Sequence, residues 1–134
     1  MSVGSQGARP VNPPAEHTEG ALPRSYLRPC LLLMLAEGPS HGYDLLEQVR
    51  RLGLRGAEPS ALYRSLRAME REELVSSSWE MSGAGPPRRT YLLSDAGHRA
   101  LHSWVGSLRD VQRLLVTMLD RYDNRVEPAA TSRL

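Results

Sequence analysis

The strongest pattern in the sequence is EPSALYRSLRAMEREE, residues 58–73. Glu58-Pro59-Ser60 is a helix start signal, because proline suits the first helical position. At about 100° per residue, one face of this helix carries the apolar residues Leu62, Leu66 and Met69. The opposite face carries one hydroxyl and three guanidinium groups, from Ser60, Arg64, Arg67 and Arg71. We expect a helix that runs to about Glu73, with a buried apolar side and a basic outer side.

Two shorter helical patterns precede this stretch. The first opens at Arg28-Pro29 and ends at Gly38-Pro39, and the second is capped by Ser40 and stopped by Gly53. A short connection that contains glycine, residues 53–57, leads to the third helix. The apolar residues of the two patterns recur at helical spacing: Leu27, Leu31, Leu32 and Leu35, then Leu45, Leu46, Val49 and Leu52.

The spacing of the apolar residues changes after the third helix. Val75–Met81 and Arg88–Leu93 alternate as strands do, and residues 82–87 supply turn residues, so the pair predicts a β-hairpin. We expect Trp79 to pack against the third helix, and Ser94 to cap a long final helix. Three helices followed by a hairpin is the order of a winged helix-turn-helix, whose third helix enters the major groove. The predicted fold class is therefore mainly α with a small β-hairpin.

The basic face of the third helix has two interpretations. It is either a solvated face on which Glu70 and Glu72 pair with the arginines, or a surface for DNA, where arginine reads guanine edges and phosphates. The net charge is only +2, but residues 50–71 contain six arginines and two glutamates. This local excess, together with the helix-turn-helix order, favours DNA.

The hairpin adds two more basic residues. Arg88 and Arg89 open its second strand, where they would meet the DNA backbone or the minor groove, although strand alternation turns one of them away. Tyr63 lies between the core and the solvent faces of the third helix. We expect it to pack against the wing and to offer its hydroxyl to a phosphate.

The final helix carries a coiled-coil seam. Its apolar residues alternate steps of three and four: Leu101, Trp104, Leu108, Val111, Leu115, Met118 and Tyr122. A domain of this size covers such a face most simply with the same helix of a second copy, and two-fold symmetry would present two recognition helices to a palindromic site. Trp104 is either part of the core or a stacking platform for an aromatic effector.

Length and composition limit how the chain can be organised. Its 134 residues suit one domain, its single cysteine excludes an internal disulfide, and no apolar run approaches the length of a membrane span. With no signal peptide pattern either, we expect a cytoplasmic protein. The expected divisions are a disordered arm at 1–24, a winged helix-turn-helix at 26–93, a dimerisation helix at 94–125 and a flexible tail at 126–134.

The sequence lacks the spacing of a catalytic or metal site. His98 and His102 are four residues apart on one helix, but no third ligand accompanies them, so we expect surface histidines and no metal. Gly83 and Gly85 fit a turn better than a nucleotide loop. We expect no cofactor and no enzyme activity.

Three motifs carry a family resemblance: GPSHGYDL at 38–45, LYRSL at 62–66 followed by Met69-Glu70, and PRRTYLLSDAG at 87–97. In this order they resemble the PadR family of bacterial transcriptional regulators, over about residues 27–122. The resemblance implies a homodimeric winged-helix repressor that a small effector releases from its operator, and some relatives bind flat hydrophobic compounds between their final helices. Glu73-Leu74 stands where the family usually has Glu-Gly.

The resemblance places His41 and Tyr43 at the start of the second helix, beside the DNA backbone. Tyr43 would either contact a phosphate or pack beneath the wing. The candidate DNA-contacting residues are thus His41, Tyr43, Ser60, Ala61, Tyr63, Arg64, Arg67, Arg71, Arg88 and Arg89. Two alternatives to an effector-released repressor stay open: a winged-helix adaptor that binds other proteins, and a constitutive DNA binder without an effector.

Overall fold

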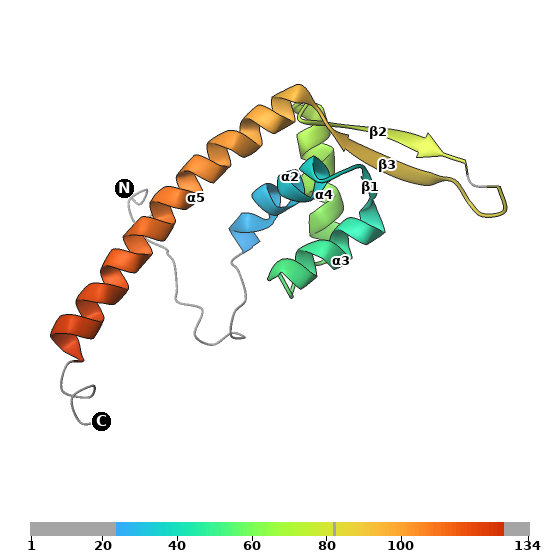
Figure 1. Cartoon of the computed structure of the whole chain (residues 1–134). Coiled ribbons are helices and arrows are strands. Elements are labelled where there is room, and N and C mark those ends of the chain that lie inside the picture. Colours follow the sequence, from blue (N-terminus) through green and yellow to red (C-terminus); the bar gives the residue numbers. More distant parts are fainter. Residues whose placement is uncertain (1–23, 82, 128–134) are drawn as a thin grey trace, which may run out of the picture.

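The computed structural model describes residues 24–81 and 83–127. A 3-10 turn, η2, precedes the first helix and a π-helical turn, η3, follows the last (Figure 1). In chain order the elements are η2 (Arg24–Tyr26), α2 (Leu27–Ala36), β1 (Ser40–His41), α3 (Gly42–Leu52), α4 (Pro59–Arg71), β2 (Val75–Glu80), β3 (Arg88–Leu93), α5 (Asp95–Arg121) and η3 (Tyr122–Val126). The predicted class, mainly helical with a hairpin, is confirmed. The predicted arm and tail lie outside the described residues except at Arg24, Val126 and Glu127.

The core forms where the apolar faces of α2, α3 and α4 meet. α2 buries most of its apolar residues, because α5 lies along one flank and α3, α4 and β3 pack against the others, while Leu33 stays exposed (Figure 1). Each large apolar side chain removed from water contributes about 1.5–3 kcal/mol. The side chains with the least exposure are Leu31, Leu32, Leu45, Val49, Leu62, Leu66 and Met69, and Cys30 lies buried beside them.

The sheet contains one strand that the sequence patterns did not predict. Its order is β1-β3-β2, all antiparallel, and Ser40 of β1 pairs with Tyr91 of β3. The prediction that Ser40 caps the second helix is therefore wrong. α3 instead begins after His41, whose side chain makes no capping hydrogen bond. The cause is the ladder with β3, which holds Ser40 in extended backbone.

The ends of α4 and α5 depend on local hydrogen bonds. α4 ends at Arg71, two residues before the predicted Glu73, because Glu73 has a φ of 64° and starts the turn into β2. Glycine usually occupies such a left-handed position after a helix. Ser94 caps α5 as predicted, since its Oγ accepts the Gly97 N–H at 3.0 Å.

The hairpin of β2 and β3 extends beyond the helices as a wing (Figure 1). Val75 at its base is buried, but the outer residues of β2 are exposed. The prediction that Trp79 packs against the third helix is wrong: Trp79 is 62% exposed, and the Arg89 guanidinium lies 5.4 Å from its ring centre. At Trp79 the strand β2 already extends beyond the helices (Figure 1).

None of the helices in the described ranges is long and apolar enough to cross a membrane.

Candidate nucleic-acid interface

The outer face of α4 is basic and exposed. Arg64, Arg67 and Arg71 are all exposed, and no hydrogen bond or ion pair joins them to another residue of the described ranges. Ser60 is exposed on the same face, and Ala61 beside it is half-buried. This arrangement leaves three guanidinium groups available to an anionic partner.

Glu70 of α4 and Glu72, the residue that follows the helix, have partners on other elements. Glu72 accepts two hydrogen bonds from Arg28 of α2, at 2.7 and 3.1 Å. Glu70 accepts a hydrogen bond from Ser77 of the wing at 2.8 Å. Neither carboxylate forms an ion pair or hydrogen bond with an α4 arginine in the described ranges, so the expected helical pairing is not formed, although the nearby charge of Arg71 helps to lower the pKa of Glu72.

Several contacts hold α4 against the rest of the domain. Its apolar face is fully buried at Leu62, Leu66 and Met69. Arg50 of α3 donates from Nε and Nη2 to the carbonyl oxygen of Ala57, which lies in the connection before α4, at 2.9 and 2.6 Å. The basic face is thus carried on a helix whose start and end are both fixed.

The two wing arginines have different polar partners, although both line one hollow. Arg89 pairs with Trp79 in the ladder, and its Nε donates to Ser77 Oγ at 2.9 Å. Its Nη2 also lies 3.7 Å from Glu70 Oε1. Arg89 therefore contacts both α4 and the wing.

Arg88 faces a second acidic group. It pairs with Glu80 in the ladder, and its Nη1 lies 3.5 Å from His41 Nδ1. His41 donates from Nε2 to Glu80 Oε1 at 3.0 Å, and this hydrogen bond holds the pKa of the Glu80 carboxyl below its ordinary value. His41 Nδ1 also lies 3.5 Å from Asp44. The wing and the start of α3 therefore share one polar cluster.

Half of the predicted DNA-contacting residues meet in a hollow of about 190 Å³ between α3, α4 and the wing. The predicted residues that line it are His41, Tyr43, Tyr63, Arg88 and Arg89. Tyr43 is 66% exposed, so its predicted alternative position beneath the wing is wrong. Tyr63 is half-buried and covers Gly42, where an added Cβ would lie 2.5 Å from its hydroxyl oxygen. The remaining predicted residues lie along α4, outside this hollow.

Sequence reasoning missed the polar contacts that four residues make with His41 or Arg89: Asp44, Glu80, Glu70 and Ser77. One signal was available for Glu80, because the hairpin register sets it opposite Arg88, and opposite charges are favoured at such positions. No comparable signal existed for Glu70, whose partners lie on another element. Burial raises the pKa of Tyr91, next to this cluster.

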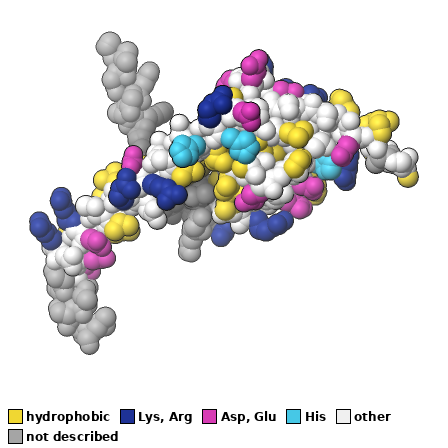
Figure 2. Space-filling view, turned by 45° about the horizontal axis from the view of Figure 1, so that its top comes forward, with side chains coloured by type: hydrophobic (Ala, Val, Ile, Leu, Met, Phe, Trp, Pro, Cys, Tyr) yellow, Lys and Arg dark blue, Asp and Glu magenta, His cyan; other side chains and the backbone are white. Residues whose placement is uncertain are grey.

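The seam of α5 divides into two parts. Leu101, Trp104 and Leu108 are half-buried, and the first two pack against the core. The later seam residues are exposed by 37% to 56%: Val111, Leu115, Met118 and Tyr122. Figure 2 shows apolar side chains at the surface of α5, interleaved with arginines and carboxylates. Within residues 24–81 and 83–127, the second half of the seam is thus uncovered.

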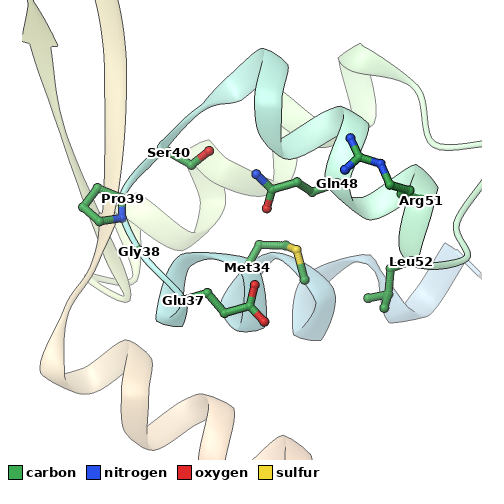
Figure 3. Close-up of a pocket in the computed structure, with 8 residues that line it drawn as sticks. All are labelled: Met34, Glu37, Gly38, Pro39, Ser40, Gln48, Arg51 and Leu52. Carbon is green, nitrogen blue, oxygen red and sulfur yellow. The ribbon is translucent and has the colours of Figure 1, made fainter.

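Two larger hollows flank α2. One, of about 450 Å³, is almost wholly apolar and lies between α2 and α5; Cys30, Leu33, Leu101, Val105 and Leu108 are among its lining residues, and Trp104 is not. The other, of about 600 Å³, lies between α2 and α3 and has a mixed polar and apolar lining (Figure 3): Met34, Glu37, Gly38, Pro39, Ser40, Gln48, Arg51 and Leu52.

Within the described residues no group of three histidine, cysteine or acidic side chains could hold a metal ion.

Comparisons with known proteins identify what this architecture resembles. The model of the transcriptional regulator PadR-like family matches residues 31–103. A probable transcriptional regulator of Mycobacterium tuberculosis is 31% identical over 77 residues, which are 56% of this chain and 41% of that protein. The chain therefore spans less than half the length of that curated relative.

Solved structures of PadR-type regulators have the same fold. The PadR-like regulator of Bacillus cereus superposes with a TM-score of 0.66 at 24% identity, over 72% of this chain and 93% of that one. A PadR family regulator of Eggerthella lenta gives 0.63 at 28% identity, over 72% of this chain and 83% of that one.

Proposed function

The chain belongs to the PadR-like family of transcriptional regulators, and on that premise we propose that it is a dimeric repressor that binds a palindromic operator and is released from it by a small hydrophobic or aromatic effector. Its class is that of a regulator, not of an enzyme. As a regulator of transcription it would act on DNA in the cytoplasm.

The observation that carries the proposal is the row of exposed arginines on α4, which have no hydrogen-bond or ion-pair partner in the part of the chain that the structure describes. Arg64, Arg67 and Arg71 are exposed, and the glutamates next to them are engaged elsewhere. Arginine forks match guanine edges and phosphate oxygens. An adaptor that binds proteins would not need three free guanidinium groups on the helix that winged-helix proteins insert into the major groove. The adaptor alternative is therefore the weaker one.

Dimerisation is supported by the uncovered half of α5. An exposed row of Leu, Met, Val and Tyr on one helix is costly in water, and the same row of a second copy would cover it. A two-fold axis there would set two α4 helices on successive turns of one duplex.

Release by an effector is supported by the apolar hollow between α2 and α5. Its volume of about 450 Å³ and its apolar lining suit a hydrophobic compound. Trp104 is not one of its lining residues, although Leu101 and Leu108, one turn to either side of it on α5, are. A ligand wedged there would change how α5 lies on α2, and hence the separation of the two recognition helices. A constitutive DNA binder is the alternative if no compound enters.

Locating the DNA that the protein binds tests this proposal most economically. Genome-wide recovery of bound fragments, beginning with the region upstream of its own gene, should give a palindromic site. Recovery of no enriched fragment, with folded protein, would reject a sequence-specific regulator acting alone.

A further inference from the structure

Glu70, Ser77 and Arg89 form a closed set of contacts between α4 and the wing. Ser77 Oγ donates to Glu70 Oε2 at 2.8 Å and accepts from Arg89 Nε at 2.9 Å. Arg89 Nη2 lies 3.7 Å from the other carboxylate oxygen, Oε1. Each of the three side chains thus contacts the other two.

The basic group in this set of contacts, the Arg89 guanidinium, remains partly exposed to solvent. The Arg89 side chain is 43% exposed, and that of Glu70 is 33% exposed. The guanidinium also lies 5.4 Å from the centre of the Trp79 ring. Of the basic residues on α4 and the adjoining wing face, Arg89 is the one that a carboxylate of α4 restrains, whereas Arg64, Arg67 and Arg71 have no such partner in the described ranges.

We propose that Glu70 is a specificity-determining residue, whose carboxylate withholds Arg89 from the phosphates of DNA that α4 cannot read. The inference rests on the proposed function, since it presupposes that α4 and the wing meet DNA. Affinity for arbitrary sequences comes almost entirely from contacts between basic side chains and phosphates. A cation that is already paired adds little to that affinity, so discrimination between operator and other DNA depends more on α4.

The carboxylate acts through its contact with Arg89. It offsets the charge of the guanidinium, so that a phosphate must displace Glu70 before it can bind there. Replacement of Glu70 by glutamine keeps an acceptor for Ser77 but removes the charge, which separates electrostatics from packing.

The test uses the full chain and a labelled duplex of random sequence, with affinity measured by fluorescence anisotropy over a series of salt concentrations. We expect Glu70→Gln to bind this duplex more tightly at low salt. Its plot of log affinity against log salt should steepen by about 0.9 for each protomer that gains a phosphate contact. Glu72→Gln is the matched control, because it also removes one carboxylate of this segment but releases Arg28 instead.

Two further variants decide whether Arg89 is responsible. In Glu70→Gln combined with Arg89→Gln, the slope should return to the wild-type value. Ser77→Ala keeps the carboxylate beside the guanidinium, so its slope should also match the wild type. A merely structural role of Glu70 would lower thermal stability without steepening the salt dependence.

The outcomes separate this inference from the proposed function. If the wild type shows no salt-dependent binding to the random duplex, the DNA-binding function fails, and the inference with it. If the wild type binds but Glu70→Gln has the wild-type slope, the inference alone is wrong. If the steeper slope persists without Arg89, Glu70 acts by general repulsion and the assignment to Arg89 is overturned.

Discussion

Arg28 and Glu72 are joined by two parallel hydrogen bonds, Nη1 to Oε1 at 2.7 Å and Nη2 to Oε2 at 3.1 Å. They connect the first turn of α2 to the residue that follows the last turn of α4. Two parallel N–H to carboxylate contacts are the strong geometry for such a pair. This pair therefore fixes the end of the helix that carries the basic face.

The hydrogen bond from Arg28 lowers the pKa of Glu72. Because the folded pKa is depressed, the stabilisation is present above the ordinary carboxyl pKa of about 4.3 and is lost as the pH falls through the lower folded value. The pair is largely exposed, so we expect Glu72→Gln to reduce the free energy of unfolding at pH 7 by only about 0.2–1 kcal/mol. Urea unfolding should show this difference shrinking at acidic pH.

Glu47→Gln is the control for this prediction. Glu47 forms only a loose pair with Arg51, at 3.8 Å, within one helix. An equal loss of stability in both variants would show that the link between α2 and α4 contributes nothing of its own.

The two glycines of α5 should respond in opposite ways to alanine. At Gly97 an added Cβ would collide with the Leu74 carbonyl oxygen and the Leu93 side chain, so Gly97→Ala should cost about 1–3 kcal/mol. At Gly106 nothing lies within 4 Å of the added carbon, so Gly106→Ala should stabilise the helix by about 0.5–1 kcal/mol. Thermal unfolding of both variants tests the prediction, which is wrong if Gly97→Ala is as stable as the wild type.

A charge on the seam of α5 should break the proposed dimer. Leu108 is half-buried and lines the apolar hollow, so Leu108→Asp is expected to give monomers or insoluble protein. Met118→Asp separates these outcomes, because Met118 is 56% exposed in the single chain and its replacement should leave the monomer folded. Sedimentation velocity would measure the mass, with Thr117→Asp as the control outside the seam. A folded Met118→Asp dimer would contradict the interface.

Fluorescence can test the proposed effector. The sequence has two tryptophans, and Trp79→Tyr leaves Trp104 on α5 as the only indole. Flat hydrophobic compounds that enter the hollow beside α5 should change its emission, and a coupling of about 1–3 kcal/mol would weaken operator binding 5- to 150-fold. Compounds that change the emission without changing DNA affinity would place a site there but not the inducer site. If no compound binds, the constitutive alternative is preferred.

Features set by nearby residues could be predicted from the sequence. The cap at Ser94 and the stop at Gly53 depend on side chains and backbone angles within one turn, and both are present. The basic face of α4 follows from helical spacing, and so does its burial at Leu62 and Leu66.

Features set by distant partners could not. β1 consists of two residues that pair with β3 some fifty positions later, so Ser40 gave no local sign of being a strand. Alternation put Trp79 on the same side of β2 as the buried Val75, but the length by which the wing overhangs the helices is a tertiary property. The link from Glu70 to Arg89 likewise depends on how α4 meets the wing.

The most direct test of the central claim is operator binding by a variant in which Arg64, Arg67 and Arg71 are all replaced by alanine. If the wild type makes about 6 to 10 phosphate contacts, it should lose affinity roughly 10³- to 10⁵-fold between 50 and 200 mM salt. The triple variant should bind operator no better than random DNA and with a shallower salt dependence. A variant with Arg99, Arg109 and Arg121 of α5 replaced should keep its preference for operator. Wild-type operator affinity in the α4 variant would contradict the account.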